Sequence, residues 1–155
     1  VSTCGLTEKI MRFADDMPQV NLAVSLHAPS DEIRLKLMPV AKSCSMSELL
    51  SVCSKYTEKT HRRITFEYAL IEGVNDSMEN AAQLAARLRG MLCHVNLIPL
   101  NRVSEKDFRG SARKHAEKFA AVLSSKGIEV TVRRELGSDI SAACGQLRLT
   151  AESEG

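Results

Sequence analysis

The chain has 155 residues, of which 21 are Lys or Arg and 19 are Asp or Glu, for a net charge of +2 at pH 7. This length favours one domain with its own core, and no apolar run reaches the ~18 residues of a membrane span. The near-neutral charge excludes binding of nucleic acid by overall electrostatics alone. Four Phe and two Tyr without Trp argue against a stacking platform for single-stranded RNA.

Strand-like runs alternate with amphipathic helical patterns along the chain. A helix is predicted over 7–16, ahead of Pro18. The predicted strands are 20–26, 64–70, 94–100 and 128–134. Three further helices are predicted from start signals: a capping box of Ser45 and Glu48, a second of Asp76 and Glu79, and a cap at Ser111 for the helix that stops near Gly127.

Strands joined through helices require a parallel sheet. In three of the four runs apolar residues alternate with small or polar ones, as in Ile64-Thr65-Phe66-Glu67. Because a parallel sheet buried on both faces would be apolar throughout, one face is expected to line a wet or ligand-filled lumen. The sequence therefore predicts an α/β fold that forms part of an open (β/α) barrel, with four to five parallel strands and outer helices. Residues 1–150 are expected to form this domain and 151–155 a tail.

Polar residues gather where the predicted strands end. Ser25 and His27 end the first run, Asn101 follows the third, Cys144 lies beyond the fourth, and Ser2 falls in another expected strand-to-helix turn. Sites in parallel βα arrays form at the carboxyl ends of the strands. A binding site is therefore predicted at this rim. The alternative is a satisfied polar pair inside the sheet for Ser25 and His27, and a simple turn residue for Asn101.

The five cysteines are odd in number and scattered, which is typical of free thiols in a reducing compartment. None of them has the spacing of a zinc or iron–sulfur site, so no metal ligand is predicted in this chain. Cys53 and Cys93 are expected in the core, whereas Cys144 stands among small residues that let a large partner approach its sulfur.

Five other residues allow interpretation from the sequence alone. Glu67 is a carboxylate in mid-strand, for which cofactor contact and pairing with Arg133 remain equal alternatives. Asn75 and Asp76 are expected to form a turn and a helix cap. His115, like His61, is expected to be solvated.

Six blocks of sequence occur in an order that is specific in combination. They are VSTxG at 1–5, SLHAP at 25–29, FEY at 66–68, GVND at 73–76, CHVNLIPLN at 93–101 and DIxAACGQL at 139–147. Together they resemble the RlmN family of radical S-adenosylmethionine (SAM) methyltransferases, which modify C2 of an adenine in 23S ribosomal RNA and transfer RNA. The resemblance extends from residue 1 to about residue 148, and it implies the C-terminal part of an open radical-SAM barrel.

The resemblance also implies the roles of individual residues. Cys144 would be catalytic, as the sulfur that first receives a methyl group from SAM and then passes it to the adenine as a methylene radical. The implied cofactor-binding residues are Ser2, Ser25, Leu26, His27 and Asn101. Besides SAM, the complete protein is expected to hold a [4Fe–4S] cluster whose cysteine ligands are absent from this chain.

Several parts of the family pattern would precede Val1: the three cluster cysteines, a second catalytic cysteine, a Gly-Glu-Pro SAM contact and an N-terminal RNA-recognition domain. The chain alone is therefore expected to be inactive. Expected partners are ribosomal or transfer RNA, the missing N-terminal part and an external electron donor, in the cytoplasm or an organelle and without a membrane. The alternatives are Cfr-type methylation at adenine C8, a truncated paralogue that binds SAM or RNA without chemistry, and a barrel lyase.

Overall fold

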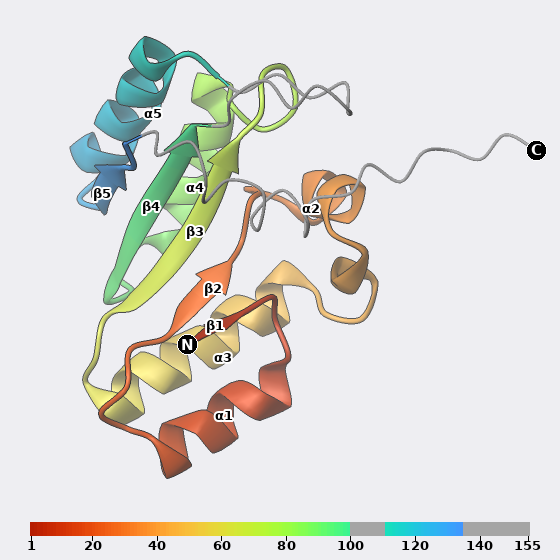
Figure 1. The fold of residues 1–155 in the computed structure, drawn as a ribbon, viewed down its shortest axis with the longest axis vertical. Coiled ribbons are helices and arrows are strands. Elements are labelled where there is room, and N and C mark those ends of the chain that lie inside the picture. The colour runs from red at the N-terminus through yellow and green to blue at the C-terminus, as the bar shows by residue number, and fades with distance from the viewer. Residues whose placement is uncertain (100–110, 135–155) are drawn as a thin grey trace, which may run out of the picture.

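The structure is a computed structural model that describes residues 1–99 and 111–134. Within these residues one sheet holds five parallel strands in the order β1-β2-β3-β4-β5 (Figure 1). The strands are β1 (Ser2–Thr3), β2 (Ala23–Ser25), β3 (Ile64–Leu70), β4 (Cys93–Pro99) and β5 (Glu129–Val132). The helices are α1 (Thr7–Asp16), α2 (Asp31–Leu37), the 3-10 helix η1 (Pro39–Lys42), α3 (Met46–Thr60), α4 (Met78–Leu88) and α5 (Arg113–Ser125).

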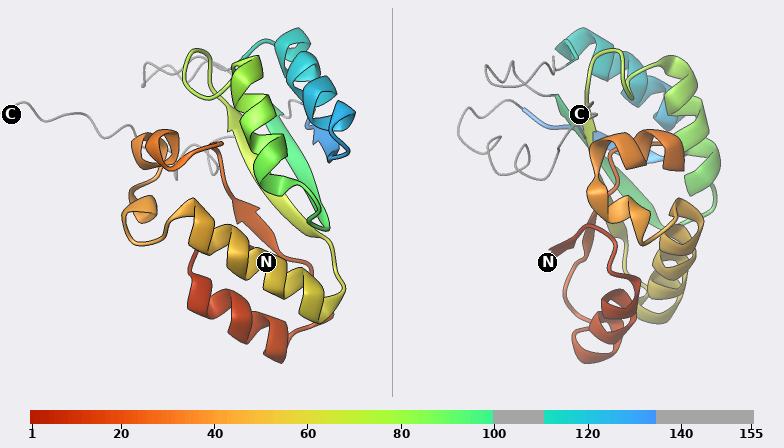
Figure 2. Two further views of the ribbon diagram at one scale, coloured as in Figure 1. Left: turned by 180° about the vertical axis from the view of Figure 1, so that it is seen from behind. Right: turned by 90° about the vertical axis from the view of Figure 1, so that its right-hand side faces the viewer.

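Each strand pairs with its neighbour in sequence, and α3 and α4 lie on the same side of the sheet (Figure 2). A doubly wound sheet would reverse its strand order and carry helices on both faces. The sequential order and the one-sided helical layer are those of an open (β/α) barrel. The predicted α/β fold with four to five parallel strands and outer helices is therefore confirmed. No helix in the described part of the chain is long and apolar enough to span a membrane.

The core lies between the sheet and these helices. Phe66, Tyr68 and Leu97 of the sheet are completely buried against helical side chains such as Phe119, whose ring centroid lies 5.3 Å from that of Tyr68. Burial of each such side chain contributes about 1.5–3 kcal/mol. The apolar residues of the alternating strand pattern therefore face the helices. The small and polar residues of the pattern lie on the opposite face of the sheet.

The helix start signals were right for α3 and misplaced for two other helices. Ser45 and Glu48 form the predicted capping box at α3. At α4 the capping box is formed one residue later than predicted, by Ser77 and Asn80. Ala112, with no side-chain cap, precedes α5. The capping groups expected of Asp76 and Ser111 bond to each other instead, because the start of α5 lies beside the loop before α4.

The first predicted strand is shorter than its alternating pattern. Only Ala23–Ser25 form β2, although 20–26 has the strand period. Ahead of the strand, the Val20 carbonyl accepts a hydrogen bond from the Tyr56 hydroxyl at 3.0 Å. This side-chain donor takes the place of a sheet neighbour. Ser2, expected in a turn, belongs to strand β1.

Candidate functional site

The face of the sheet away from α3 and α4 carries small and polar side chains in two rows set by the strand register. The first row is Ser2, Ala23, Thr65, His94 and Glu129, and the second is Ser25, Glu67, Asn96 and Thr131. The second row lies nearer the carboxyl ends of the strands. Ser2 thus shares a face with Ser25 but lies one row behind it, about 6–7 Å along the strand.

His27 follows β2 in a turn that departs from the sheet. Its backbone has a φ of 56°, in the left-handed region, and its side chain is 3% exposed. The ring accepts a hydrogen bond at Nδ1 from the backbone N–H of Ala69, at 2.8 Å. Because an amide can only donate, Nδ1 carries no proton, and the neutral ring must hold its proton at Nε2. Among residues 1–99 and 111–134, no group bonds that Nε2.

The sequence left two interpretations of His27 open: contact with a cofactor, or a hydrogen-bonded polar pair with Ser25 inside the sheet. The structure shows that the ring is hydrogen-bonded inside the protein through Nδ1, which agrees with part of the second interpretation. However, its partner is the Ala69 backbone and not Ser25. The Nε2–H of the same ring makes no hydrogen bond within the described residues and can donate to a ligand.

Burial, together with the positive charge of Arg34, lowers the pKa of His27 from 6.5 to about 4. The unfolded chain takes up this proton near 6.5 and the folded chain only near 4, so the free energy of unfolding should fall as the pH decreases between these values. We expect a loss of about 2 kcal/mol at about pH 5 relative to neutral pH, and no contribution of this group above about pH 7. Denaturant unfolding at about pH 5 and at neutral pH measures this loss of stability. An equal pH dependence in His27→Asn would contradict the assignment.

Leu26 differs from its two neighbours because its side chain belongs to the hydrophobic core. It is fully buried in the cluster that packs under the helices, and its N–H donates to the Glu67 carbonyl at 3.0 Å. Only the Leu26 carbonyl therefore remains for contact with a ligand on the opposite face.

Glu67 has a partner that the sequence did not indicate. The Asn96 carboxamide, next to it in the second row, donates to its Oε2 at 3.0 Å. Partial burial raises the pKa of Glu67, while this hydrogen bond and the charge of Arg133 lower it. Both alternatives for Glu67 therefore stay open, with Asn96 as a further member of the cluster.

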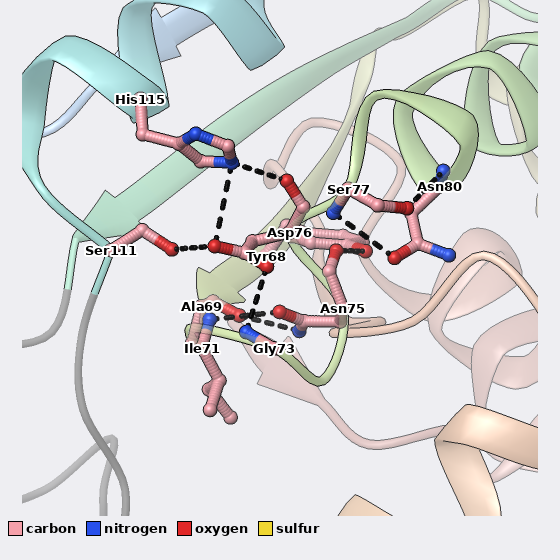
Figure 3. Close-up of polar contacts among 10 residues, drawn as sticks. All are labelled: Tyr68, Ala69, Ile71, Gly73, Asn75, Asp76, Ser77, Asn80, Ser111 and His115. Atoms are coloured by element: carbon pink, nitrogen blue, oxygen red, sulfur yellow. Dashed lines mark hydrogen bonds and ion pairs between the residues drawn. The ribbon is translucent and has the colours of Figure 1, made fainter.

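The loop between β3 and α4 connects several elements through Asp76 (Figure 3). Its carboxylate accepts hydrogen bonds from the Gly73 N–H at 3.0 Å and from the Ser111 hydroxyl at 2.6 Å. His115 Nε2 lies 2.5 Å from the Asp76 carbonyl and 3.4 Å from its carboxylate. The expectation that His115 is solvated holds only in part: its side chain is 38% exposed, but α5 places its ring against this loop. The expected turn at Asn75 and Asp76 is confirmed, and the cap belongs to Ser77.

Arg34 of α2 was not singled out in the sequence, since an Arg in a short helix usually faces solvent. It is completely buried, and its guanidinium donates to the carbonyls of Cys4 at 2.8 Å and Cys44 at 3.3 Å. A Cβ on Gly5, where φ is +115°, would lie 3.2 Å from Nη2. Glycine is therefore required both for the backbone and for the approach of the guanidinium. Arg34 thus links α2 to the turn that follows β1 through its hydrogen bond to the Cys4 carbonyl.

Cys53 and Cys93 lie in the core as expected, and burial raises their pKa values to about 12 and about 11. Such thiols carry little thiolate and are unreactive. The described residues contain no cluster of three or more His, Cys, Asp or Glu that could hold a metal ion. Cys144 and Asn101 lie outside the described residues.

An open depression of about 630 Å³ lies at the other end of the sheet, near the start of β4 and β5. Its lining includes His94, Glu129 and Gly127. Ser2, Ser25, Leu26 and His27, the predicted cofactor-binding residues that the structure describes, do not contribute to it. The candidate site is therefore defined by the polar groups at the carboxyl ends of β2 and β3.

Comparison with known proteins identifies relatives of the chain. No family profile matches it. A probable dual-specificity RNA methyltransferase RlmN of Clostridium perfringens is 57% identical over 148 residues, which are 96% of this chain and 43% of that protein. The RlmN of Caldanaerobacter subterraneus is 56% identical over 155 residues, 100% of this chain and 45% of that protein.

A solved structure agrees. The crystal structure of a radical SAM methyltransferase from Sphaerobacter thermophilus matches with a TM-score of 0.88 and 51% sequence identity, over 96% of this chain and 44% of that one. The chain thus spans less than half the length of the proteins it matches. Over nearly all of its own length it belongs with one part of the RlmN family of RNA methyltransferases.

Proposed function

We propose that this chain is the C-terminal part of an enzyme that methylates C2 of an adenine in ribosomal and transfer RNA, with SAM as the methyl source. The observation that carries the proposal is the identity of 56–57% to RlmN proteins over at least 96% of the chain. The complete polypeptide would also hold a [4Fe–4S] cluster and receive electrons from an external donor.

The described residues suit an adenosyl ligand. Ser25, the Nε2–H of His27 and the Glu67–Asn96 pair offer donors and acceptors at the carboxyl ends of neighbouring strands. Hydroxyl, imidazole and carboxamide groups can bind a ribose, an amino acid moiety or the edge of an adenine. Within the described residues, α3 and α4 lie on the other side of the sheet from these groups (Figure 2).

SAM, when bound, would supply the methyl group and, with the cluster, the radical chemistry. The residues of this chain would bind and orient it: Ser2, Ser25 and His27 with their side chains, Leu26 with its carbonyl, and Asn101. Cys144 would accept the methyl group on its sulfur and hold it against the adenine. Such positioning of reacting groups contributes on the order of 7–11 kcal/mol to a reaction.

The test is a methylation assay of a full-length polypeptide of which this chain is the C-terminal part. The protein is reconstituted with iron and sulfide without oxygen, then given SAM, a reductant and either a 23S ribosomal RNA fragment or transfer RNA. Mass spectrometry of the digested RNA should show 2-methyladenosine. Methylation at C8 would instead indicate Cfr-type chemistry, and SAM binding without methylation would indicate a non-catalytic relative.

A further inference from the structure

We propose that Asn75 is a positioning residue of the SAM site: its carboxamide holds the turn after β2 in the conformation that presents His27 to the cofactor. The inference rests on the proposed function, because it takes His27 to be a SAM ligand. Asn75 itself is completely buried in the loop between β3 and α4, and its side chain has no access to a ligand.

The need for such a residue arises from the unequal lengths of β2 and β3. Strand β2 ends at Ser25, paired with Glu67, whereas β3 continues to Leu70. The N–H groups of Leu26 and His27 both donate to the same Glu67 carbonyl, at 3.0 and 3.3 Å, so the regular ladder stops there. Beyond this point the groups of Ala69 and His27 need other partners, since buried backbone groups are costly to leave unpaired.

The Asn75 carboxamide supplies those partners. Its Nδ2 donates to the His27 carbonyl at 2.7 Å and to the Ala69 carbonyl at 2.7 Å. Its Oδ1 accepts from the Ile71 N–H at 2.8 Å (Figure 3). Both amide protons are thus used, and a flip of the carboxamide would set its oxygen against two carbonyls. The orientation of this side chain is therefore unique.

The same two residues are also joined through the His27 ring, whose Nδ1 accepts from Ala69. His27 and Ala69 are therefore connected twice: by the imidazole on one side and by the Asn75 bridge on the other. Because His27 has a positive φ, which is unfavourable for a residue with a side chain, the turn depends on these bonds to persist. Loss of the bridge would let the turn relax and move the ring away from the cofactor.

The capping box at the end of the same loop makes no hydrogen bond to this turn. Ser77 bonds only within α4, through the capping box with Asn80. Ser77→Ala therefore provides a matched control, because it weakens the same loop by the loss of a helix cap but leaves the bonds of His27 intact.

The experiment compares Asn75→Ser, Ser77→Ala and the unchanged sequence in a full-length polypeptide of which this chain is the C-terminal part. Thermal unfolding gives the stability, and equilibrium dialysis with labelled SAM gives the dissociation constant. We expect Asn75→Ser to weaken SAM binding about tenfold or more, since a small misplacement of a binding group has effects of this size. Ser77→Ala should change binding by less than about twofold, although the loss of the helix cap also lowers the stability.

Three outcomes are informative. A folded Asn75→Ser that binds SAM like the unchanged protein would overturn the inference. Equal weakening by Ser77→Ala would overturn it as well, because binding would then follow stability alone. If the unchanged protein did not bind SAM, the proposed function would fail first, and the inference would fail with it.

A second measurement needs no variant and covers the case in which Asn75→Ser does not fold. In the unchanged protein, the NMR signals of the Asn75 side-chain amide and of the Ala69 backbone amide should shift on addition of SAM, since both groups bond directly to His27. The Asn80 side-chain amide, which lies in the capping box of the same loop, should not shift. Unshifted Asn75 and Ala69 signals at saturating SAM would contradict the inference.

Discussion

Replacement of Cys144 by Ala is expected to abolish RNA methylation while leaving SAM binding unchanged. The sulfur is the proposed carrier of the methyl group, and alanine has no atom that can accept it. In a full-length polypeptide the variant should give no measurable methylated adenosine, and its SAM dissociation constant should match that of the unchanged protein. Mass spectrometry of the RNA and equilibrium dialysis provide the two measurements.

Cys53 supplies the matched control for this experiment. It is a completely buried thiol in the core, with a pKa raised to about 12 by burial. Cys53→Ala should lower the free energy of unfolding by about 1–2 kcal/mol, because it leaves a small cavity, and should retain methylation. Normal turnover by Cys144→Ala would end the assignment of this residue.

Replacement of His27 should separate its role in the fold from its role toward the cofactor. His27→Ala removes the acceptor of the buried Ala69 N–H and places alanine in a left-handed backbone, so we expect a loss of about 2–3 kcal/mol of stability. His27→Asn should retain most of the stability, because asparagine tolerates that backbone and its side-chain oxygen can accept the same bond. Both variants should weaken SAM binding about tenfold or more, since neither has the Nε2–H donor.

Denaturant unfolding and SAM dialysis on the two variants check this expectation. The informative variant is His27→Asn, because it keeps the turn while changing the donor. If it bound SAM as tightly as the unchanged protein, the imidazole would have no part in binding, and the contact made by the Ser25–His27 segment would be limited to its backbone and to Ser25.

The arrangement of the fold could be predicted because it depends on patterns that the chain repeats. The alternation in β3 (Ile64–Leu70) matched its boundaries in full, and the capping box at Ser45 marked the start of α3. Residues 20–22 have the same alternation, yet β2 begins only at Ala23. The partner of the Val20 carbonyl comes from α3, and no local pattern indicates it.

The candidate site was less predictable, because its organisation depends on contacts between distant segments. Polar residues at strand ends pointed to Ser25 and His27, but the bond from Ala69 to the ring joins residues 42 positions apart. Arg34 bonds a carbonyl 30 positions away, and Ser111 bonds Asp76 across 35 positions. Sequence spacing shows the types of residue available, whereas these bonds arise only after the strands have paired.

The order of the strands has a consequence for how the chain folds. Within the described residues each strand pairs with the strands that adjoin it in sequence, so every pairing closes a loop no longer than one βα unit. Short closures cost little entropy, so assembly can advance unit by unit from the N-terminal side as the polypeptide leaves the ribosome. In a sheet whose strand order reverses, the central strands can be paired on both sides only after later segments of the chain have been synthesised.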